Sequence, residues 1–347
     1  MQHINNLKKQ HIKKTDNILI DNFNREHTYL RISITEKCNL RCTYCMPAEG
    51  IPLSPKSHIM NYDEVFEIAK KFVDLGVTKI RITGGEPLVR KDVAVILRKL
   101  ATLPVELSIT TNGIIIDKFI DVFKECNIQK INISIDSLNE TKFNQITRRK
   151  DFERVYKNIM LFTNDDFFKV KLNCVLMKDV NDDEINDFIE FTKHHKLNVR
   201  FIEFMPFNGN EWKLDQLVSL ATIVETAQNH FGTNDIVRIK DAPNDTSKNY
   251  QLKNAKGSFA IISTVTNPFC DSCNRIRLTA NGKLKNCLFS GGEEDLLTAL
   301  RAGENIEKPI KIAIQSKKKM RGGMDSQKQF TSDELRLDNR SMIAIGG

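Results

Sequence analysis

Three cysteines in the first part of the chain, Cys38, Cys42 and Cys45, lie close enough together to bind one inorganic group. They directly follow a β-branched stretch that ends at Thr35. A structural zinc ion normally takes four ligands, and no fourth cysteine or nearby histidine completes this group. Three thiolates instead suit a 4Fe–4S cluster whose fourth iron stays open. The spacing therefore predicts chemistry at an open iron.

A second group, Cys270, Cys273 and Cys287, has the same incomplete character. A zinc ribbon would need another Cys-x2-Cys pair, so a second 4Fe–4S cluster with an open iron is favoured over zinc. Between these cysteines, Arg275 and Arg277 stand two apart on an extended segment, which points both side chains to one face. Two guanidinium groups on one face suit phosphate oxygens.

The segment Gly84-Gly85-Glu86-Pro87 ends the second predicted strand. Gly and Pro are common in ordinary turns, so the segment alone indicates little. Because it follows the second strand as the first cysteine group follows the first strand, the segment is expected to contribute to the same site. Two residues without a Cβ let the backbone approach a ligand closely, and Glu86 offers a hydrogen-bond acceptor.

The elements that must position these residues follow a repeated pattern of strand and helix. We expect strands at 29–35, 78–83, 106–110, 130–135, 169–176 and 198–204, and helices at 62–75, 91–102, 116–125, 139–162 and 182–195. Such alternation gives parallel strands joined by right-handed crossovers. Six units are too few for an eight-stranded barrel. We therefore expect an α/β fold, a partial, open (β/α)6 TIM-like barrel, with a doubly wound sheet as the alternative.

The chain divides into three predicted parts. Residues 1–27 are polar and Lys-rich and are expected to form a flexible basic arm, and residues 28–234 form the barrel core. Residues 235–347 form a C-terminal extension that carries the second cysteine group and ends in Gly-Gly. In this extension we expect short strands at 235–240, 248–253 and 258–264 and a helix near 293–302.

The charge of the chain lies mostly at its ends. The net charge is +8, with +3 in residues 1–20 and +5 in residues 308–340. The nearly neutral middle argues against a nucleic-acid-binding core. We expect no transmembrane helix and no secretory signal, and a cytoplasmic location in which clustered cysteines bind metal. A mitochondrial transit peptide is the alternative for the acidic-poor N-terminus.

These features resemble the radical S-adenosylmethionine (SAM) superfamily, in which the first cysteine loop follows strand one and Gly-Gly-Glu-Pro ends strand two. Within it, the chain is similar to the MoaA family, the GTP 3′,8-cyclases of molybdenum-cofactor biosynthesis. The similarity runs from about Asp21 to Gly347 and includes LRISITEKCNLRCTYCMP, KIRITGGEPLVR, FCDSCNRIRLTANGKLKNCLF and the terminal IGG. The chain departs from the family at Asn24, where Gly is usual.

The resemblance implies two 4Fe–4S clusters and SAM as cofactors and GTP as substrate. SAM would give a 5′-deoxyadenosyl radical that abstracts the 3′-hydrogen of GTP. The C3′ radical would attack C8 of a guanine bound at the second cluster. The product would be (8S)-3′,8-cyclo-7,8-dihydroguanosine 5′-triphosphate, the first intermediate on the route to molybdopterin.

The resemblance also implies partners. They are a flavodoxin- or ferredoxin-like one-electron donor, a downstream cyclic pyranopterin monophosphate synthase and a second copy of the chain in a homodimer. Neither a nucleic acid nor a membrane is implied.

Matching positions imply roles for single residues. Cluster one would be held by Cys38, Cys42 and Cys45, and cluster two by Cys270, Cys273 and Cys287. SAM would contact Tyr44, Gly85, Ser134 and Met205. GTP would contact Arg31, Arg81, Thr110, Lys171, Arg275, Ile276 and Arg277. Because Arg31, Arg81 and Lys171 stand inside apolar strands, they suggest a triphosphate clamp; a buried ion pair with Asp136 or Glu203 is the alternative.

The remaining residues of interest lie near the C-terminus or in the core. The resemblance implies that Gly346 and Gly347 thread into the barrel and help start the reaction; a frayed end and an adenylation tail are the alternatives. Cys126 and Cys174 are expected to be buried as small apolar residues, and Lys317–Lys319 and Arg321 to be solvated.

Two other functions compete with a GTP cyclase. One is another radical SAM enzyme with an auxiliary cluster, such as a peptide-modifying maturase, although these usually carry more C-terminal cysteines. The other is a zinc-bound binding module, which leaves Gly-Gly-Glu-Pro and both missing fourth ligands unexplained.

Overall fold

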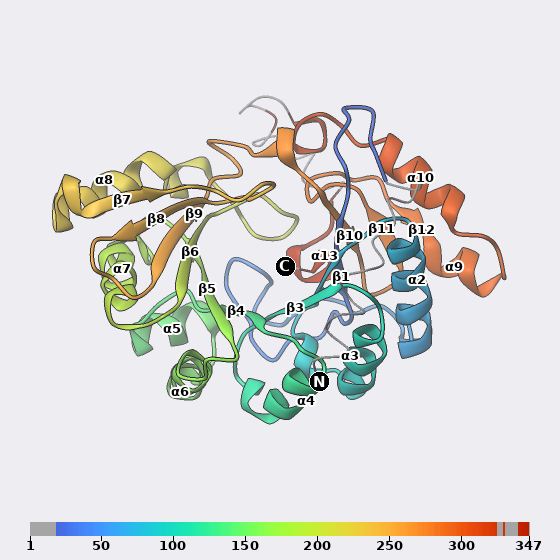
Figure 1. Ribbon diagram of the computed structural model, residues 1–347, viewed down its shortest axis with the longest axis horizontal. Coiled ribbons are helices and arrows are strands. Elements are labelled where there is room, and N and C mark those ends of the chain that lie inside the picture. Colours follow the sequence, from blue (N-terminus) through green and yellow to red (C-terminus); the bar gives the residue numbers. More distant parts are fainter. Residues whose placement is uncertain (1–18, 325–328, 330–338, 347) are drawn as a thin grey trace.

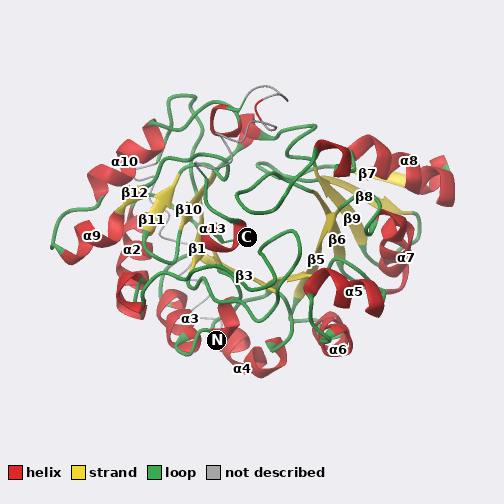
Figure 2. Cartoon of the chain, turned by 180° about the vertical axis from the view of Figure 1, so that it is seen from behind, coloured by secondary structure: helices red, strands yellow, loops and turns green. Residues whose placement is uncertain are grey.

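The computed structural model describes residues 19–324, 329 and 339–346 of the chain. One curved sheet of twelve strands runs through it in the order β12-β11-β10-β1-β2-β3-β4-β5-β6-β9-β8-β7. In the described residues its two edge strands do not pair with each other. Helices cover the outside of the curve, whereas the short C-terminal helix α13 (Met342–Ile345) lies inside it (Figures 1 and 2). The predicted partial, open barrel is confirmed.

The six predicted barrel strands are present and pair in parallel. Their bounds are β1 Tyr29–Ser33, β2 Lys79–Thr83, β3 Glu106–Thr111, β4 Lys130–Ser134, β5 Lys169–Leu176 and β6 Asn198–Glu203. The helices that connect them are α2 Tyr62–Asp74, α3 Val93–Ala101, α4 Ile120–Glu125, α5 Glu140–Thr147, α6 Phe152–Thr163 and α7 Ile185–His194.

One long predicted helix, 139–162, is two helices in the structure. The helix α5 ends at Thr147, because the next residue, Arg148, has a left-handed φ of 54° that cannot continue an α-helix. The next helix, α6, begins after Asp151. The break matters because the end of α5 contacts the first cysteine loop.

The C-terminal region extends the same sheet at both edges. Its strands are β7 Ile236–Ile239, β8 Lys248–Leu252, β9 Ser258–Ile262, β10 Arg275–Leu278, β11 Lys283–Lys285 and β12 Glu294–Asp295. Strand β9 pairs in parallel with β6, and β10 pairs in parallel with β1. The helices α8 Leu220–Phe231 and α10 Glu307–Gln315 were not expected, whereas α9 Leu296–Arg301 matches the expected helix near 293–302.

The barrel strands alternate between apolar residues that pack under the helices and polar residues that face the inside. In β5, Val170, Leu172 and Cys174 are buried, while Lys171 and Asn173 on the other face are only partly covered. Cys174 is 0% exposed and Cys126 is 6% exposed, so their expected burial is confirmed. Period-two alternation thus gives the barrel an apolar outside and a polar inside.

The segment before β1 is packed against the body from Leu19 onward. Asp21, Arg25 and His27 are buried, and Asp21 Oδ2 lies 2.6 Å from Arg25 Nε and 3.1 Å from His27 Nε2. The predicted flexible arm therefore does not extend over residues 19–27, and residues 1–18 lie outside the described part. Asn24 has a φ of 60°, a turn conformation that Gly adopts freely and Asn tolerates.

Among the described residues, no helix has the length and apolar character that crossing a bilayer requires.

Candidate active site

The first cysteine loop follows β1 and is held by the end of α5. Arg41 N donates to Thr147 O at 3.0 Å. Arg148 Nη1, in the left-handed residue after α5, donates to Arg41 O and to Met46 O, each at 3.1 Å. These bonds fix the loop directly before Cys42 and directly after Cys45.

Gly84 and Gly85 let the end of β2 lie directly against this loop. Gly85 N donates to Thr35 O at 2.7 Å. A Cβ on Gly85 would stand 2.5 Å from Lys37 O, and a Cβ on Gly84 would stand 2.7 Å from Thr35 O. Backbone atoms cannot move away cheaply, so both glycines are needed for the close approach of two chain segments.

Glu86 does not face the cavity, which corrects the expectation that it offers an acceptor to a ligand. Its side chain is 0% exposed. Oε1 accepts from Leu88 N at 3.0 Å and Thr111 Oγ1 at 2.7 Å, and Oε2 accepts from Asn112 N at 2.6 Å. Burial raises the pKa of this carboxyl to about 7 against the opposing effect of these donors. Glu86 therefore braces the turns after β2 and β3.

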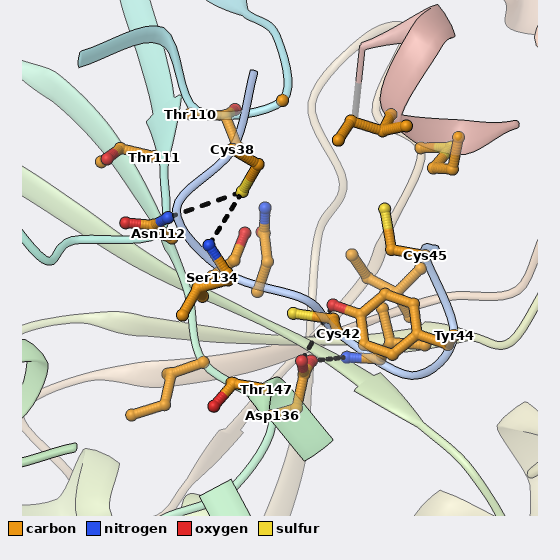
Figure 3. Close-up of a pocket in the computed structure, with 18 of the residues that line it drawn as sticks. Cys38, Cys42, Tyr44, Cys45, Thr110, Thr111, Asn112, Ser134, Asp136 and Thr147 are labelled. Carbon is orange, nitrogen blue, oxygen red and sulfur yellow. Dashed lines mark hydrogen bonds between the residues drawn. The ribbon is translucent and has the colours of Figure 1, made fainter. Parts of the chain in front are cut away.

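A cavity of about 190 Å³ lies at the carboxyl ends of the barrel strands (Figure 3). Every predicted ligand of the first cluster and of SAM lines it, together with one predicted GTP contact: Cys38, Cys42, Tyr44, Cys45, Gly85, Thr110, Ser134 and Met205. These residues come from five separate segments between residues 38 and 205. The fold therefore brings together what the resemblance assigned to one site.

The thiols of the first group are strongly shielded from water. Burial raises the pKa of Cys38 to about 11 and that of Cys45 to about 12, and raises that of Cys42 well above its ordinary value. Metal binding must therefore displace protons from these thiols. Next to Cys45, Tyr44 donates its hydroxyl to Asp136 Oδ2 at 2.9 Å, and burial raises the pKa of Asp136 to about 6.

A row of arginines crosses three neighbouring strands on the inner face. Arg277 in β10, Arg31 in β1 and Arg81 in β2 are register partners. Burial and then the charge of Arg277 lower the pKa of Arg31 well below its ordinary value. Arg31 Nε is buried and, among the described residues, has no hydrogen-bond partner. Like charges held this closely favour the binding of an anion between them.

The alternative of a buried ion pair with Asp136 or Glu203 is wrong. Asp136 accepts from Tyr44 and from Val175 N. Glu203 accepts from Val265 N at 2.7 Å and from Thr266 N at 3.1 Å. Both carboxylates thus accept from neutral donors, and neither of them pairs with the arginine row.

Further basic residues face the same interior from the opposite side. Burial and then the charge of Arg200 lower the pKa of Lys171 to about 7. Burial and then the charge of Arg81 lower the pKa of Arg200 to about 10. Sequence analysis missed Arg200, although its place two residues after Asn198 in β6 fits the inward-facing positions of that strand.

Tyr29 is a second residue that sequence analysis missed. Its hydroxyl accepts from Arg81 Nε, and Lys79 Nζ and Arg275 Cζ lie 5.0 and 5.5 Å from its ring centroid. Burial opposes ionisation of the phenol, but the charges of Arg81, Arg31 and Lys79 outweigh it and lower its pKa to about 7. Its place two residues before Arg31, on the same strand face, was the available signal.

Ile276 is placed differently from its neighbours Arg275 and Arg277. Its side chain is 0% exposed and belongs to the hydrophobic core. In β10, alternation points the two arginines to the opposite face. Only the main chain of Ile276 is therefore suited to contact a ligand in the cavity.

The second cysteine group surrounds the start of β10. Cys270 and Cys273 lie at a short turn before that strand, and Cys287 follows β11. Burial opposes ionisation of Cys273, but the charges of Lys317 and Arg275 outweigh it and lower its pKa. Among the described residues, no three His, Cys, Asp or Glu side chains gather around a point where one metal ion would fit.

The expectation that Lys317 and Arg321 are solvated is wrong. They are 4% and 8% exposed. Arg321 N donates to Cys270 Sγ at 3.4 Å, and Lys317 Nζ lies 3.7 Å from Cys273 Sγ. Lys318 and Lys319 are exposed, as expected.

The C-terminal tail enters the barrel (Figure 1). Arg277 Nη1 donates to Gly346 O at 2.8 Å. Gly346 has a φ of 88°, and a Cβ there would stand 2.7 Å from Ser33 Cβ and 2.8 Å from Thr83 Oγ1. Ile345 is 1% exposed in an apolar cluster flanked by Tyr44, Met205 and Cys287. The expected threading is confirmed up to Gly346, and Gly347 lies outside the described residues.

Comparisons with known proteins agree with this architecture. The family described as the radical SAM superfamily matches residues 32–192, and the family described as Molybdenum Cofactor Synthesis C matches residues 197–322. A solved structure of Streptococcus suis SuiB bound to S-adenosylmethionine is 17% identical, with a TM-score of 0.57 over 97% of this chain and 75% of that chain. At this identity the likeness concerns the fold alone.

Relatives found by sequence comparison are more similar in sequence than this solved structure. A mitochondrial GTP 3′,8-cyclase of Arabidopsis thaliana is 45% identical over 95% of this chain and 84% of its own length. A GTP 3′,8-cyclase of Lactiplantibacillus plantarum is 40% identical over 86% of this chain and 90% of its own length. Molybdenum cofactor biosynthesis protein 1 of Homo sapiens is 39% identical over 97% of this chain, which spans 52% of that relative.

Proposed function

The chain belongs to the GTP 3′,8-cyclase family of the radical SAM superfamily, and we propose that it converts GTP to (8S)-3′,8-cyclo-7,8-dihydroguanosine 5′-triphosphate, the first step of molybdenum-cofactor biosynthesis. One observation supports this most strongly. The three cysteines of the first group share a cavity with Tyr44, Gly85, Ser134 and Met205.

The first cysteine group suits a cofactor with an open iron. Cys38, Cys42 and Cys45 would hold a 4Fe–4S cluster, which would supply the one electron needed to generate the SAM-derived radical for removal of the 3′-hydrogen of GTP. The chain contributes position and shielding. Tyr44 anchors the loop to Asp136, and the buried surroundings keep water from the reacting atoms.

The arginine row suits the triphosphate of GTP. Arg31, Arg81 and Arg277 would each donate charge-assisted hydrogen bonds to phosphate oxygens, with Arg275, Lys171 and Thr110 around them. Binding an anion there would offset the burial and the repulsion from Arg277 that lower the pKa of Arg31. Tyr29 would keep the side chain of Arg81 in place through its hydroxyl.

The second cysteine group and the tail would complete the site. Cys270, Cys273 and Cys287 would hold a second 4Fe–4S cluster, which would supply a binding position for the guanine, with a main-chain contact from Ile276. Gly346 and Gly347 would act at the reacting centre, because the tail reaches Ser33, Thr83 and Arg277 at the carboxyl ends of the strands.

The proposed partners follow from family membership. They are a flavodoxin- or ferredoxin-like electron donor, a cyclic pyranopterin monophosphate synthase that takes the product, and a second copy of the chain. We propose a cytoplasmic location, with the mitochondrion as the alternative because one relative is named for it.

Two cysteine variants test the assignment of the two groups under anaerobic turnover with SAM, GTP and a chemical reductant. Cys42→Ser should abolish formation of 5′-deoxyadenosine, because the first cluster loses a ligand. Cys273→Ser should keep the first cluster and some uncoupled SAM cleavage but lose GTP cyclisation. Full 5′-deoxyadenosine formation by Cys42→Ser, or normal cyclisation by Cys273→Ser, would contradict the proposal.

A further inference from the structure

Lys317 is a buried cation for which no carboxylate lies within ion-pair distance among the described residues. It follows α10 and is 4% exposed. Its Nζ donates to Asn286 O at 2.7 Å and to Arg275 O at 2.9 Å, and lies 3.7 Å from Cys273 Sγ. Three acceptors use all three donors of the ammonium. A buried ammonium is costly unless a negative charge lies beside it, and here the candidate is the sulfur of Cys273.

The contacts of Lys317 join two separate parts of the second cysteine group. Arg275 lies two residues after Cys273, and Asn286 directly precedes Cys287. The ammonium therefore ties the chain at Cys273 to the chain at Cys287. The same segment reaches the third cysteine, because Arg321 N donates to Cys270 Sγ at 3.4 Å.

Arg25 also holds the segment around Lys317 in place. Its Nη1 donates to Cys270 O at 2.9 Å and to Lys319 O at 2.7 Å, and its Nη2 donates to Lys318 O at 2.9 Å. The guanidinium thus bonds the first cysteine of the group and the segment around Lys317 at once. Lys317 is held by its surroundings and is not free to swing into solvent.

The first cysteine group has no such cation at a sulfur. Its sulfurs meet uncharged donors: Leu40 N at 3.4 Å and Asn112 Nδ2 at 3.9 Å lie at Cys38, the Tyr44 hydroxyl lies at Cys42, and the main chain of Ile343 lies at Cys45. Within the described residues, no lysine contacts these three sulfurs. The two groups are therefore unlike in their electrostatic surroundings.

We propose that Lys317 is a positioning residue of the second iron–sulfur cluster, where its buried ammonium ties the Cys273 and Cys287 ligands together and stabilises the reduced cluster. The inference rests on the second cluster proposed above. Reduction adds negative charge to a cluster, and a cation beside a ligand sulfur favours the more negative state, so it raises the reduction potential.

The test isolates the second cluster by replacing Cys38, Cys42 and Cys45 with Ser. In this background Lys317→Met, which keeps most of the side-chain length but removes the charge, is compared with Lys319→Met, which removes an exposed charge two residues away. Each protein is reconstituted anaerobically with iron and sulfide. Iron per chain is then measured by a colorimetric iron assay, and the midpoint potential is measured by electron paramagnetic resonance during a redox titration.

We expect Lys317→Met to retain about four iron atoms per chain with a midpoint potential more negative than that of the background, and Lys319→Met to match the background. Unchanged potential in a fully loaded Lys317→Met protein would overturn the inference. If Lys317→Met loses iron, Lys317→Arg is tested in the same background. Iron content equal to that of the background would support the role of the positive charge, and iron content as low as that of Lys317→Met would refute it. A background protein that binds no iron would instead refute the second cluster itself.

Discussion

The position of Gly346 predicts a large effect of adding one methyl group. In Gly346→Ala the new Cβ would stand 2.7 Å from Ser33 Cβ and 2.8 Å from Thr83 Oγ1, and φ is 88°. Such backbone strain costs about 1–3 kcal/mol for a residue with a side chain, and overpacking costs about as much again. Because a free-energy change of about 1.4 kcal/mol changes an equilibrium constant tenfold, the ratio of docked to undocked tail should fall by ~30-fold or more.

The assay follows 5′-deoxyadenosine and cyclised nucleotide under anaerobic turnover, and hydrogen exchange reports whether residues 342–346 are docked. Gly346→Ala should lose most turnover and most protection of the tail, while its iron content should equal that of the parent chain. Gly303→Ala is the matched control, because Gly303 has a φ of 74° but open space around its Cβ position. It should turn over like the parent chain. Parent-like turnover by Gly346→Ala would refute the idea that the docked tail is needed.

Three further substitutions test the first cysteine loop, the arginine row and the stability of the fold. Gly85→Ala should lose the iron of the first group, since its Cβ would meet Lys37 O at 2.5 Å; unchanged iron content would show that the loop tolerates the shift. Tyr29→Phe removes the hydroxyl that holds Arg81 and should weaken GTP binding by about 5-fold, roughly 1 kcal/mol, as measured by calorimetry. Guanosine binding should be unaffected, and an equal loss for guanosine would show that Tyr29 does not support the arginine row. Burial, and then the charge of Lys317, lower the pKa of His27 from 6.5 to about 4. Between these two pH values the unfolded chain binds more protons than the folded chain, so the free energy of unfolding falls by up to ~3 kcal/mol as pH drops from 6.5 to 4. His27→Gln should flatten this part of the pH profile in urea titrations, and an unchanged slope would contradict the assignment.

The features that could be predicted from sequence are local ones. Strand and helix alternation depends on neighbours within a few residues, so the predicted ends of the six barrel strands differ from the structure by at most two residues. The cysteine groups and Gly84-Gly85 were likewise visible, because their spacing is read within a few residues. The close approach of Gly85 to Lys37 is the physical reason for the second glycine.

The features that were missed depend on contacts between distant parts of the chain. Lys317 looks like one of three solvated lysines until the fold brings it to Cys273, 44 residues earlier. Glu86 looks like a ligand-binding acceptor until Thr111 and Asn112 are seen to use its oxygens. Arg25 could not be linked to Cys270, 245 residues away, by any local pattern. Tyr29 was a different case, because alternation in β1 already placed it beside Arg31.

The central claim is that this chain moves the 3′-hydrogen of GTP to an adenosyl radical. The most direct measurement supplies GTP carrying deuterium at C3′, with SAM and reductant under anaerobic conditions, and analyses the 5′-deoxyadenosine by mass spectrometry. The account predicts one deuterium in 5′-deoxyadenosine and a cyclised nucleotide that has lost it. Unlabelled 5′-deoxyadenosine together with unchanged GTP would contradict the account.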